Sequence, residues 1–251
     1  MENKHTRGEL AQLQSLPLSA KILRSKALIR AWYEHFDGDV HVSFSGGKDS
    51  TVLKHLVDGI YSDVPSIFVN TGLEYPEIQR FVRQCKDGMF ECCGLNSNVE
   101  IVYPERKFTD IIRDVGYPVI SKEVAQVIYE GRRGADRLDG SYIYRLHRLY
   151  DTGPYEVPEG GKKSQFSASR YNFLLKAPFP VSNLCCNYMK KEPMKKLEKE
   201  RDSRPFIGTM AAESAARKQQ WIRHGCNSFD KSRMSSNPMA FWREREMCLN
   251  I

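Results

Sequence analysis

Long apolar runs are missing from this 251-residue chain. No stretch approaches the roughly 18–20 consecutive apolar residues that a membrane-spanning helix needs, so we expect no membrane insertion. The opening residues, MENKHTRGEL, contain no apolar segment of the kind that a secretory signal requires. Charged residues make up 27% of the chain and hydrophobic residues 41%, which is ordinary for a folded domain and unlike a disordered one. We therefore predict a soluble cytoplasmic protein.

Cysteine patterns that hold zinc or build disulfide frameworks are missing as well. The seven cysteines are an odd number and contain no CxxC, which argues against a zinc ribbon and favours reduced thiols or metal ligands. Cys92 and Cys93 are adjacent in sequence, as are Cys185 and Cys186, and neighbouring cysteines rarely bond to each other. We interpret Cys85, Cys92 and Cys93 as structural residues. The six histidines show no ligand spacing, so we assign none of them to a metal.

Acidic residues are outnumbered, with 31 Asp and Glu against 38 Lys and Arg and a net charge of +7. This balance favours anionic partners. Residues 187–223 carry an excess of five positive charges, which indicates either a solvated helix face or a surface for a nucleotide or a nucleic acid. Residues 131–148 combine five arginines with tyrosines. A plain amphipathic helix explains that segment best. The alternative is that it binds nucleic acid or a second phosphate.

Strand-like and helix-like segments alternate along the chain. The pattern predicts strands at 40–44, 66–69 and 99–103, and helices at 18–36, 51–60, 75–84, 108–115, 193–200 and 211–224. Strands that alternate with helices at this spacing form a parallel sheet covered on both faces, so we predict an α/β fold. Gly, Pro and Ser make up eight of the twenty residues at 151–170, which we interpret as a mobile loop.

The segment VHVSFSGGKDSTVLKHL, residues 40–56, carries the most informative chemistry. A strand leads into residues 45–50, SGGKDS, and a helix leaves them; the two glycines let the backbone turn tightly and approach an anion. The helix that follows aims its free N–H groups and the positive end of its dipole at that anion. Ser45 and Ser50 add hydroxyl donors, and Lys48 adds a cation. Asp49 is placed to hold a Mg²⁺ ion or to orient the loop.

This loop is neither a Walker A motif nor a Rossmann motif. Val42 stands where a Walker A loop needs Gly, Asp49 stands where it needs Ser or Thr, and no G-x-G-x-x-G is present in the segment. The sequence SGGKDS instead resembles the pyrophosphate loop, or PP-loop, of the ATP pyrophosphatases. That group includes the N-type synthetases, tRNA thiolation enzymes and the sulfonucleotide reductases.

Further segments resemble the phosphoadenosine phosphosulfate (PAPS) reductase family in particular. Residues 70–77, NTGLEYPE, are similar to that family's D-T-G-x-x-x-P-E, with Asn70 in place of the usual acid. Residues 185–194, CCNYMKKEPM, resemble the C-C-x-x-x-K-x-x-P-[LM] segment of its iron–sulfur members. The segment from Gly208 to Arg217 fits part of the G-x(4)-[EQ]-[EQ]-S-x-x-R region, and Phe241-Trp242-Arg243-Glu244 looks like the family's W-x-x-[ED].

The resemblance implies an adenine nucleotide alpha hydrolase-like fold, with a mostly parallel central sheet and helices on both faces. It implies a nucleotide-binding domain over residues 1–225, with an N-terminal helix, and a short helical segment over 226–251. ATP with Mg²⁺ is the expected ligand, and Lys48 and Asp49 are the expected catalytic residues. The expected nucleotide and phosphate contacts are Ser43, Ser45, Gly46, Gly47, Lys48, Asp49, Ser50, Asn70, Thr71, Gly72, Glu74, Ser214 and Arg217.

The iron–sulfur members of the family also suggest a [4Fe–4S] cluster. Thiolates are favourable ligands for such a cluster. Cys185, Cys186 and Cys226 would supply three of them, with Cys248 as the fourth candidate. The later CxxC of the iron–sulfur members is absent from this sequence. Buried structural thiols and a zinc site are the alternatives.

Two sequence differences from the reductases decide which function we expect first. The sequence ends MCLNI, inside the helix expected to begin at Trp242, so Cys248 is not followed by the reductases' E-C-G-L-H tail and we expect a family member shortened at its carboxyl end. Met210 and Ala211 stand where the reductases carry arginines. We therefore expect ATP-dependent sulfur or adenylyl transfer, with nucleic acid among the acceptors considered, ahead of PAPS or APS reduction.

A third class of function stays open. The chain could be a non-catalytic nucleotide-binding regulator, or a subunit of a complex in which a protein partner supplies the missing carboxyl-terminal elements. A homodimer is a further alternative.

Overall fold

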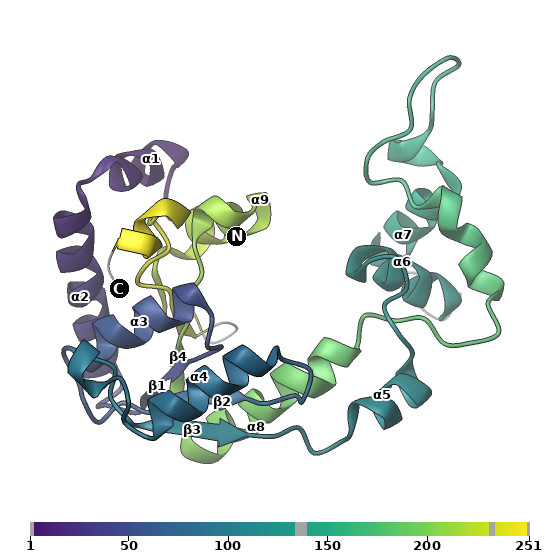
Figure 1. Cartoon of the computed structure of the whole chain (residues 1–251). Coiled ribbons are helices and arrows are strands. Elements are labelled where there is room, and N and C mark those ends of the chain that lie inside the picture. The colour runs from purple at the N-terminus through teal and green to yellow at the C-terminus, as the bar shows by residue number, and fades with distance from the viewer. Residues whose placement is uncertain (1–2, 134–139, 231–233, 250–251) are drawn as a thin grey trace. The chain divides into compact units, whose positions relative to one another are not determined.

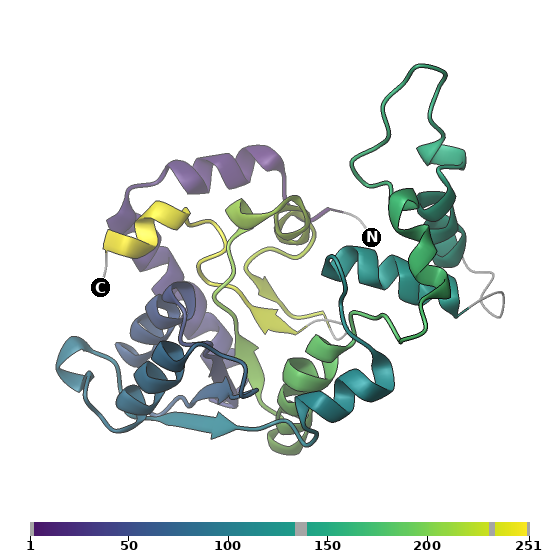
Figure 2. The same cartoon turned by 45° about the vertical axis from the view of Figure 1, so that its right-hand side comes forward.

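Residues 3–133, 140–230 and 234–249 are described by the computed structural model, which divides the chain into two compact units. The first unit consists of Met1–Tyr103 and Met194–Ile251, and the second unit of Pro104–Pro193. This division by compactness differs from the boundary expected near residue 225, which concerned nucleotide binding and stays a prediction. Figures 1 and 2 show the elements of both units from two directions.

The first unit contains all the named strands of the described chain. Its elements are α1 (Arg7–Ser15), α2 (Leu18–His35), β1 (Val40–Ser43), α3 (Lys48–Asp58), β2 (Ser66–Val69), α4 (Pro76–Lys86), η1 (Glu91–Cys93), β3 (Val99–Val102), most of α8 (Glu192–Arg201), β4 (Arg204–Phe206), η6 (Ala211–Glu213), α9 (Ala215–His224), β5 (Asn227–Ser228), β6 (Ser235–Ser236) and η7 (Glu244–Leu249). The predicted helices and strands of the first hundred residues are therefore present, with boundaries shifted by a few residues at most.

The strands form one six-stranded sheet in the order β3-β2-β1-β4-β6-β5. Neighbouring strands are parallel except β5, which runs antiparallel to β6. Val42 of β1 pairs with Ser66 of β2 on one side and with Phe206 of β4 on the other. Helices pack around this sheet (Figure 2), which confirms the predicted α/β class with a mostly parallel sheet. The sequence did not predict β4, β5 or β6.

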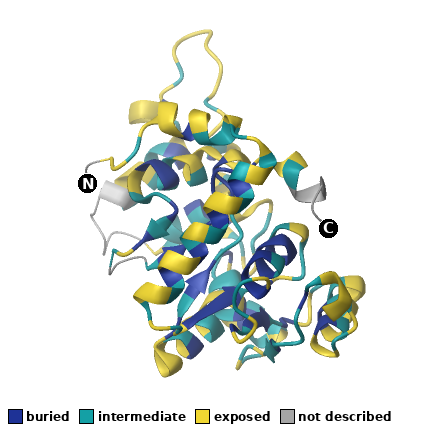
Figure 3. Cartoon of the chain, turned by 90° about the vertical axis from the view of Figure 1, so that its left-hand side faces the viewer, coloured by how far each residue is buried: buried dark blue, intermediate teal, exposed yellow. Residues whose placement is uncertain are grey.

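The core of the first unit lies between the sheet and its helices. Val42 and Ile67 are buried on β1 and β2, as expected for strands that are covered on both faces. Trp32 of α2 and Trp242, which precedes η7, are fully buried in the same apolar cluster. Figure 3 shows buried residues on the strands and on the inward sides of the helices. Burial of each large apolar side chain contributes about 1.5–3 kcal/mol to stability.

The last described segment is tied to α2 by polar groups inside this core. The Lys21 ammonium lies 2.7 Å from a carboxylate oxygen of Glu246, and both its side chain and the ion pair are shielded from water. Ser25 Oγ donates to the carbonyl of Pro238 and accepts a hydrogen bond of 2.9 Å from the indole of Trp242. Since a buried polar group without a partner is costly, these bonds fix the position of the segment on α2.

The second unit is helical, and in the described residues its only strand-like contact is an isolated bridge between Tyr117 and Val181. Its elements are α5 (Phe108–Val115), α6 (Lys122–Arg132), α7 (Gly140–Tyr150), η3 (Gly153–Tyr155), η4 (Ser169–Lys176) and a π-helical turn, η5 (Asn187–Lys191). A small core gathers Val127 and Ile128 of α6 with Leu149 of α7. In the segment 151–170, Asp151 pairs with Lys163 at 2.7 Å; mobility of this segment stays a prediction.

None of the helices that the structure describes combines the length and the hydropathy that crossing a membrane requires.

Candidate functional site

Three loops meet at the carboxyl edge of the sheet in the first unit. Residues 45–47 follow β1, Asn70 follows β2, and Gly208 follows β4. Because these strands are parallel neighbours in the order β2-β1-β4, their ends lie side by side. The chain order reverses between β1 and β4, and ligands of open α/β sheets bind at such a switch point. The loop with the predicted anion-binding residues therefore lies at the expected position.

The two glycines of this loop have different structural roles. Gly46 has a φ of +69°, and a Cβ atom there would lie 2.8 Å from Val82 and 2.9 Å from Ile78, both on α4. Gly47 has an ordinary φ of −84°, and a Cβ there would come no closer than 3.4 Å to any neighbour, the hydroxyl of Ser45. Gly46 is thus required by the packing of the protein itself. Gly47 leaves open space beside the loop.

Hydroxyl groups brace the loop from within. The hydroxyl of Ser50 donates to the carbonyl of Gly47 at 2.9 Å and accepts from the backbone N–H of Ser45 at 3.1 Å. The two serine hydroxyls also lie 2.9 Å apart. Gly47 is the N-cap of α3 and provides no side-chain cap for that helix. The first N–H groups of a helix have no partner within it, so an uncapped helix start is a binding place for an anion.

Lys48 and Asp49, the predicted catalytic residues, lie in the first turn of α3. The ammonium of Lys48 lies 3.2 Å from a carboxylate oxygen of Glu244 in η7, in an exposed ion pair. Asp49 Oδ1 is shielded from solvent and has no hydrogen-bond partner among the described residues. Burial of such an oxygen is costly unless a partner satisfies it. Mg²⁺ binds proteins through one or two carboxylates and the phosphates of its substrate, so this donor set fits the expected Mg²⁺ ion.

The nucleotide contacts predicted after β2 lie in one turn, residues 70–74, which is closed by hydrogen bonds among its own residues. The side-chain oxygen of Asn70 accepts from the N–H of Gly72 at 2.9 Å, and Gly72 has a φ of +77°. The N–H and the hydroxyl of Thr71 both donate to the carboxylate of Glu74, at 2.9 and 2.7 Å. These groups give the turn its shape, and a contact of any of them with a nucleotide stays a prediction.

The loop after β4 packs directly on the anion loop. A Cβ atom on Gly208 would lie 3.0 Å from the carbonyl oxygen of Asp49, so a larger residue would require the backbone of one of the two loops to shift. Gly208 begins the motif that ends at Arg217, but we did not predict it as a site residue. Ser214 and Arg217, which were, have local roles: Ser214 Oγ accepts from the N–H of Arg217 at 3.2 Å and caps α9, and Arg217 pairs with Glu213. Their contact with a nucleotide stays a prediction.

Ser43, the remaining predicted contact, is the half-buried last residue of β1 and is in register with Ile67. Its role toward a nucleotide also stays a prediction. The structure adds Glu244 and Ile78 to the surroundings of the loop. No sequence pattern links either of them to the loop, because Lys48 and Glu244 are distant in sequence and Ile78 looks like an ordinary core position of α4.

The predicted cluster ligands are distributed over both units. Cys185 and Cys186 precede the π-helical turn of the second unit, whereas Cys226 belongs to the first unit. Cys248 lies within η7, and its side chain lies outside the described part of the structure. Within the described residues of either unit, no group of three or more His, Cys, Asp or Glu side chains is placed to hold a metal ion.

The local surroundings of Cys185 and Cys226 favour neutral thiols. Burial raises the pKa of Cys226 to about 11, although its sulfur accepts a hydrogen bond of 3.3 Å from the indole of Trp221. Burial and the neighbouring Cys186 thiol raise the pKa of Cys185. Cluster ligands are thiolates, so ligation would have to overcome these surroundings. The [4Fe–4S] cluster stays a prediction.

The arginines of residues 131–148 that the structure describes are partly used for packing. Arg148 is almost fully buried and donates to the carbonyl of Phe166 and to the carboxylate of Glu123. Arg132 donates to three backbone carbonyls of the segment 174–179. The segment belongs to two helices, with Arg132 at the end of α6 and Arg148 in α7, and is not the single amphipathic helix that we predicted. Binding of nucleic acid or of a second phosphate by this segment stays a prediction. Arg137, another of the five arginines, lies outside the described residues.

Comparison with known proteins agrees with the motifs. Residues 39–121 match the family model described as phosphoadenosine phosphosulfate reductase domain. A stretch of 64 residues is 36% identical to an uncharacterised protein, MJ0973, of Methanocaldococcus jannaschii, and covers 24% of this chain and 16% of that protein. A stretch of 91 residues is 34% identical to the phosphoadenosine 5′-phosphosulfate reductase of Serratia proteamaculans, and covers 31% of this chain and 37% of that enzyme. The chain thus matches well under two thirds of the length of either relative.

Proposed function

We propose that this chain, whose residues 39–121 match the PAPS reductase domain model, is a PP-loop protein that binds ATP and transfers its adenylyl group to an acceptor. The observation that carries the proposal is the uncapped start of α3 at Gly47, between the ends of β2, β1 and β4. The pyrophosphate part of ATP would lie on the loop Ser45–Ser50, which contains backbone N–H groups, two serine hydroxyls and the ammonium of Lys48. Adenosine would extend along the strand ends toward the turn at Asn70.

Each residue of the loop has a distinct task in this reaction. An acceptor oxygen attacks the α-phosphorus, the bond to the bridging oxygen breaks, and pyrophosphate leaves with the electron pair of that bond. The N–H groups at the start of α3 and the Lys48 ammonium stabilise the charge that grows on pyrophosphate. Lys48 would exchange its ion pair with Glu244 for a phosphate oxygen, at little cost because exposed ion pairs contribute at most about 1 kcal/mol.

Asp49 would hold Mg²⁺ through its buried oxygen, Oδ1, which has no protein partner among the described residues. When bound there, the ion would neutralise charge on the phosphate oxygens. The adenylylated acceptor would next receive sulfur or an amine, with release of AMP. A nucleic acid is one acceptor class that the net charge of +7 would suit.

Reduction of PAPS or APS is the second candidate function, because the similar Serratia protein is named as a PAPS reductase. One observation favours ATP over PAPS. Met210 and Ala211, at the positions where the resembled reductases carry arginines, are buried apolar side chains and offer no cation to a second phosphate group. A non-catalytic nucleotide-binding subunit is the third candidate.

Calorimetric titration of the protein with ATP and Mg²⁺ tests the binding step. In Gly47→Val the new side chain would occupy the open space beside the loop, and we expect at least a hundredfold loss of affinity. Gly8→Val is the matched control, because a Cβ on Gly8 comes no closer than 3.8 Å to its nearest neighbour and lies on α1. Tight ATP binding by Gly47→Val would reject the site.

Product analysis tests the chemistry. Formation of AMP and pyrophosphate from ATP supports adenylyl transfer, whereas ADP and phosphate would contradict it. Release of sulfite from PAPS in the presence of a dithiol would favour the reductase. Binding of ATP without turnover of either compound would favour the non-catalytic subunit.

A further inference from the structure

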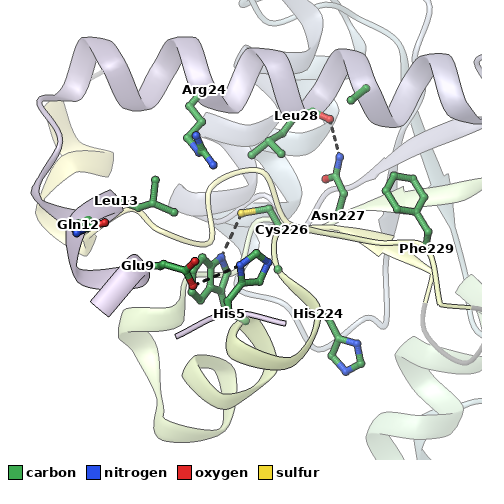
Figure 4. A pocket seen from close by; sticks show the side chains of 13 residues that line it. His5, Glu9, Gln12, Leu13, Arg24, Leu28, His224, Cys226, Asn227 and Phe229 are labelled. Carbon is green, nitrogen blue, oxygen red and sulfur yellow. Dashed lines mark hydrogen bonds and ion pairs between the residues drawn. The ribbon is translucent and has the colours of Figure 1, made fainter. Parts of the chain in front are cut away.

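A cavity in the first unit is lined by no residue of the loop Ser45–Ser50, which we call the phosphate loop. Its volume is about 550 Å³, within the range of small-molecule sites. It lies between the N-terminal helices α1 and α2 on one side and α9 with the start of β5 on the other (Figure 4). The cavity is therefore large enough for an organic molecule of moderate size.

One wall of the cavity is a fixed aromatic stack. The rings of His5 and Trp221 are stacked with their centroids 4.8 Å apart. The backbone N–H of His5 donates to the carbonyl of Ile222 at 2.9 Å, which holds the N-terminal segment on α9. Gly225 has a φ of +75°, and a Cβ there would lie 2.6 Å from His5 Nε2. The absence of a side chain at Gly225 thus makes room for the stack.

The opposite walls are mainly apolar. Leu13, Leu28 and Phe229 line the cavity, and Figure 4 shows their side chains around it. Flat aromatic rings and aliphatic side chains together suit a ligand with a flat apolar body. Cys226 also lines the cavity. Burial raises its pKa to about 11, so its thiol is neutral and a poor nucleophile.

One cation projects into this cavity without a partner in the described chain. Arg24 on α2 points toward the centre in Figure 4, and among the described residues its guanidinium makes no hydrogen bond or ion pair. Arg24 and Cys226 both line the cavity, and the charge of Arg24 offsets a small part of the rise that burial causes in the pKa of Cys226. A guanidinium presents paired N–H groups that match the two oxygens of a carboxylate.

Among the described residues, Glu9 has the one carboxylate that lines the cavity, and this carboxylate is hydrogen-bonded to Thr6 at the start of α1. Glu9 accepts a hydrogen bond of 2.6 Å from the N–H of Thr6, in the capping box of α1. It also lies 3.8 Å from His5 Nδ1. Glu9 therefore stabilises the start of α1 and lies beside His5, whereas Arg24 supplies a cation to the lining of the cavity.

We propose that this cavity binds a small organic carboxylate with a flat apolar body. The carboxylate lies on the guanidinium of Arg24, and the body lies between Leu28, Trp221 and Phe229. The site is separate from the phosphate loop, so its ligand is bound in addition to a nucleotide.

Titration with indole-3-acetate tests both halves of this proposal. The wild-type protein is expected to bind indole-3-acetate at least tenfold more tightly than indole, which lacks the carboxylate, or acetate, which lacks the body. Arg24→Gln is expected to lose at least tenfold in affinity. The matched control Arg30→Gln, an exposed arginine on the same helix that does not line the cavity, should keep the wild-type affinity.

A second variant tests the location without removing a charge. Ala31 is exposed on α2 and lines the cavity, so Ala31→Trp fills space without disturbing the core, and it should abolish binding of the probe. Excess ATP with Mg²⁺ should leave binding of indole-3-acetate unchanged. The proposal is overturned if wild-type protein binds no probe at millimolar concentration, if Arg24→Gln or Ala31→Trp binds like wild type, or if ATP displaces the probe.

Discussion

The two units of this chain differ in how they are held together. The first unit is built on a mostly parallel sheet with glycines at its carboxyl edge, and large side chains such as Trp32 and Trp242 are fully buried. The second unit has no named strand in its described residues and a smaller core. It contributes eight of the fourteen large apolar side chains that are exposed in the described chain, although it is the smaller unit. Apolar packing dominates the first unit, whereas bonds from arginines to backbone carbonyls have a larger share in the second.

The largest expected effect comes from the core of the first unit. Trp32→Ala removes a side chain with no exposed surface, and we expect a loss of about 4 kcal/mol in the free energy of unfolding. Leu23→Ala on the same helix is the control, since Leu23 is 69% exposed and its loss should cost under about 0.5 kcal/mol. Urea unfolding of the three proteins measures the difference. Equal midpoints would contradict the described core.

The next largest effect on stability distinguishes the two glycines of the phosphate loop. Gly46→Ala combines an unfavourable positive φ with a clash against α4, and should cost about 3 kcal/mol. Gly47→Ala has neither problem, and its poorer N-cap should cost only about 1 kcal/mol. Thermal unfolding compares the two variants. If Gly47→Ala were the less stable of the two, the assigned roles of the glycines would be reversed.

A third prediction concerns pH and the first unit. Burial lowers the pKa of His41 to about 4, and its Nδ1 lies 2.8 Å from Ser203 Oγ. A pKa lowered in the folded state means that the unfolded state takes up the proton first, so stability is lost as pH falls from about 6.5 toward 4. The shift corresponds to roughly 3 kcal/mol. His41→Gln should flatten this part of the stability profile, measured by urea unfolding at several pH values, and an unchanged slope would contradict it.

The smallest effect tests the polar bonds of the second unit. Arg132→Met keeps the length of the side chain but removes three hydrogen bonds to carbonyls of 174–179, and should cost about 2 kcal/mol. Arg133→Met is the control, because Arg133 is exposed. Amide hydrogen exchange of residues 169–180 should quicken in the first variant and stay unchanged in the second. Equal exchange in both would show that apolar contacts alone hold this segment.

Much of the first unit could be predicted from the sequence, because its signals are local. β1 and β2 are short β-branched or aromatic runs, each followed by a turn that contains glycine. β4 contains a proline, and β5 and β6 are polar pairs such as Ser235–Ser236, so no apolar pattern marks them. Contacts with the rest of the sheet decide those strands. The break before α9 was missed for a similar reason, since Ser214 ends one helical pattern and caps the next.

The site was predictable to the extent that it lies in one segment. Residues 45–50 are adjacent in sequence, and their order of strand, glycines and helix implies an anion-binding loop. The approach of Gly208 to Asp49 joins residues that are far apart in the chain, and no local pattern encodes it. The cavity beside α1 and α2 was also not predictable, because His5 contacts Trp221 and Gly225, which are far from it in sequence.

The double support of the phosphate loop has a kinetic consequence. Side chains of α4 pack on Gly46, and the backbone at Gly208 packs on Asp49. The loop therefore loses its conformational entropy when the chain folds, and not when a ligand arrives. Association with a nucleotide should then proceed in a single step with a rate proportional to ligand concentration, without the plateau that a slow rearrangement of the loop would impose.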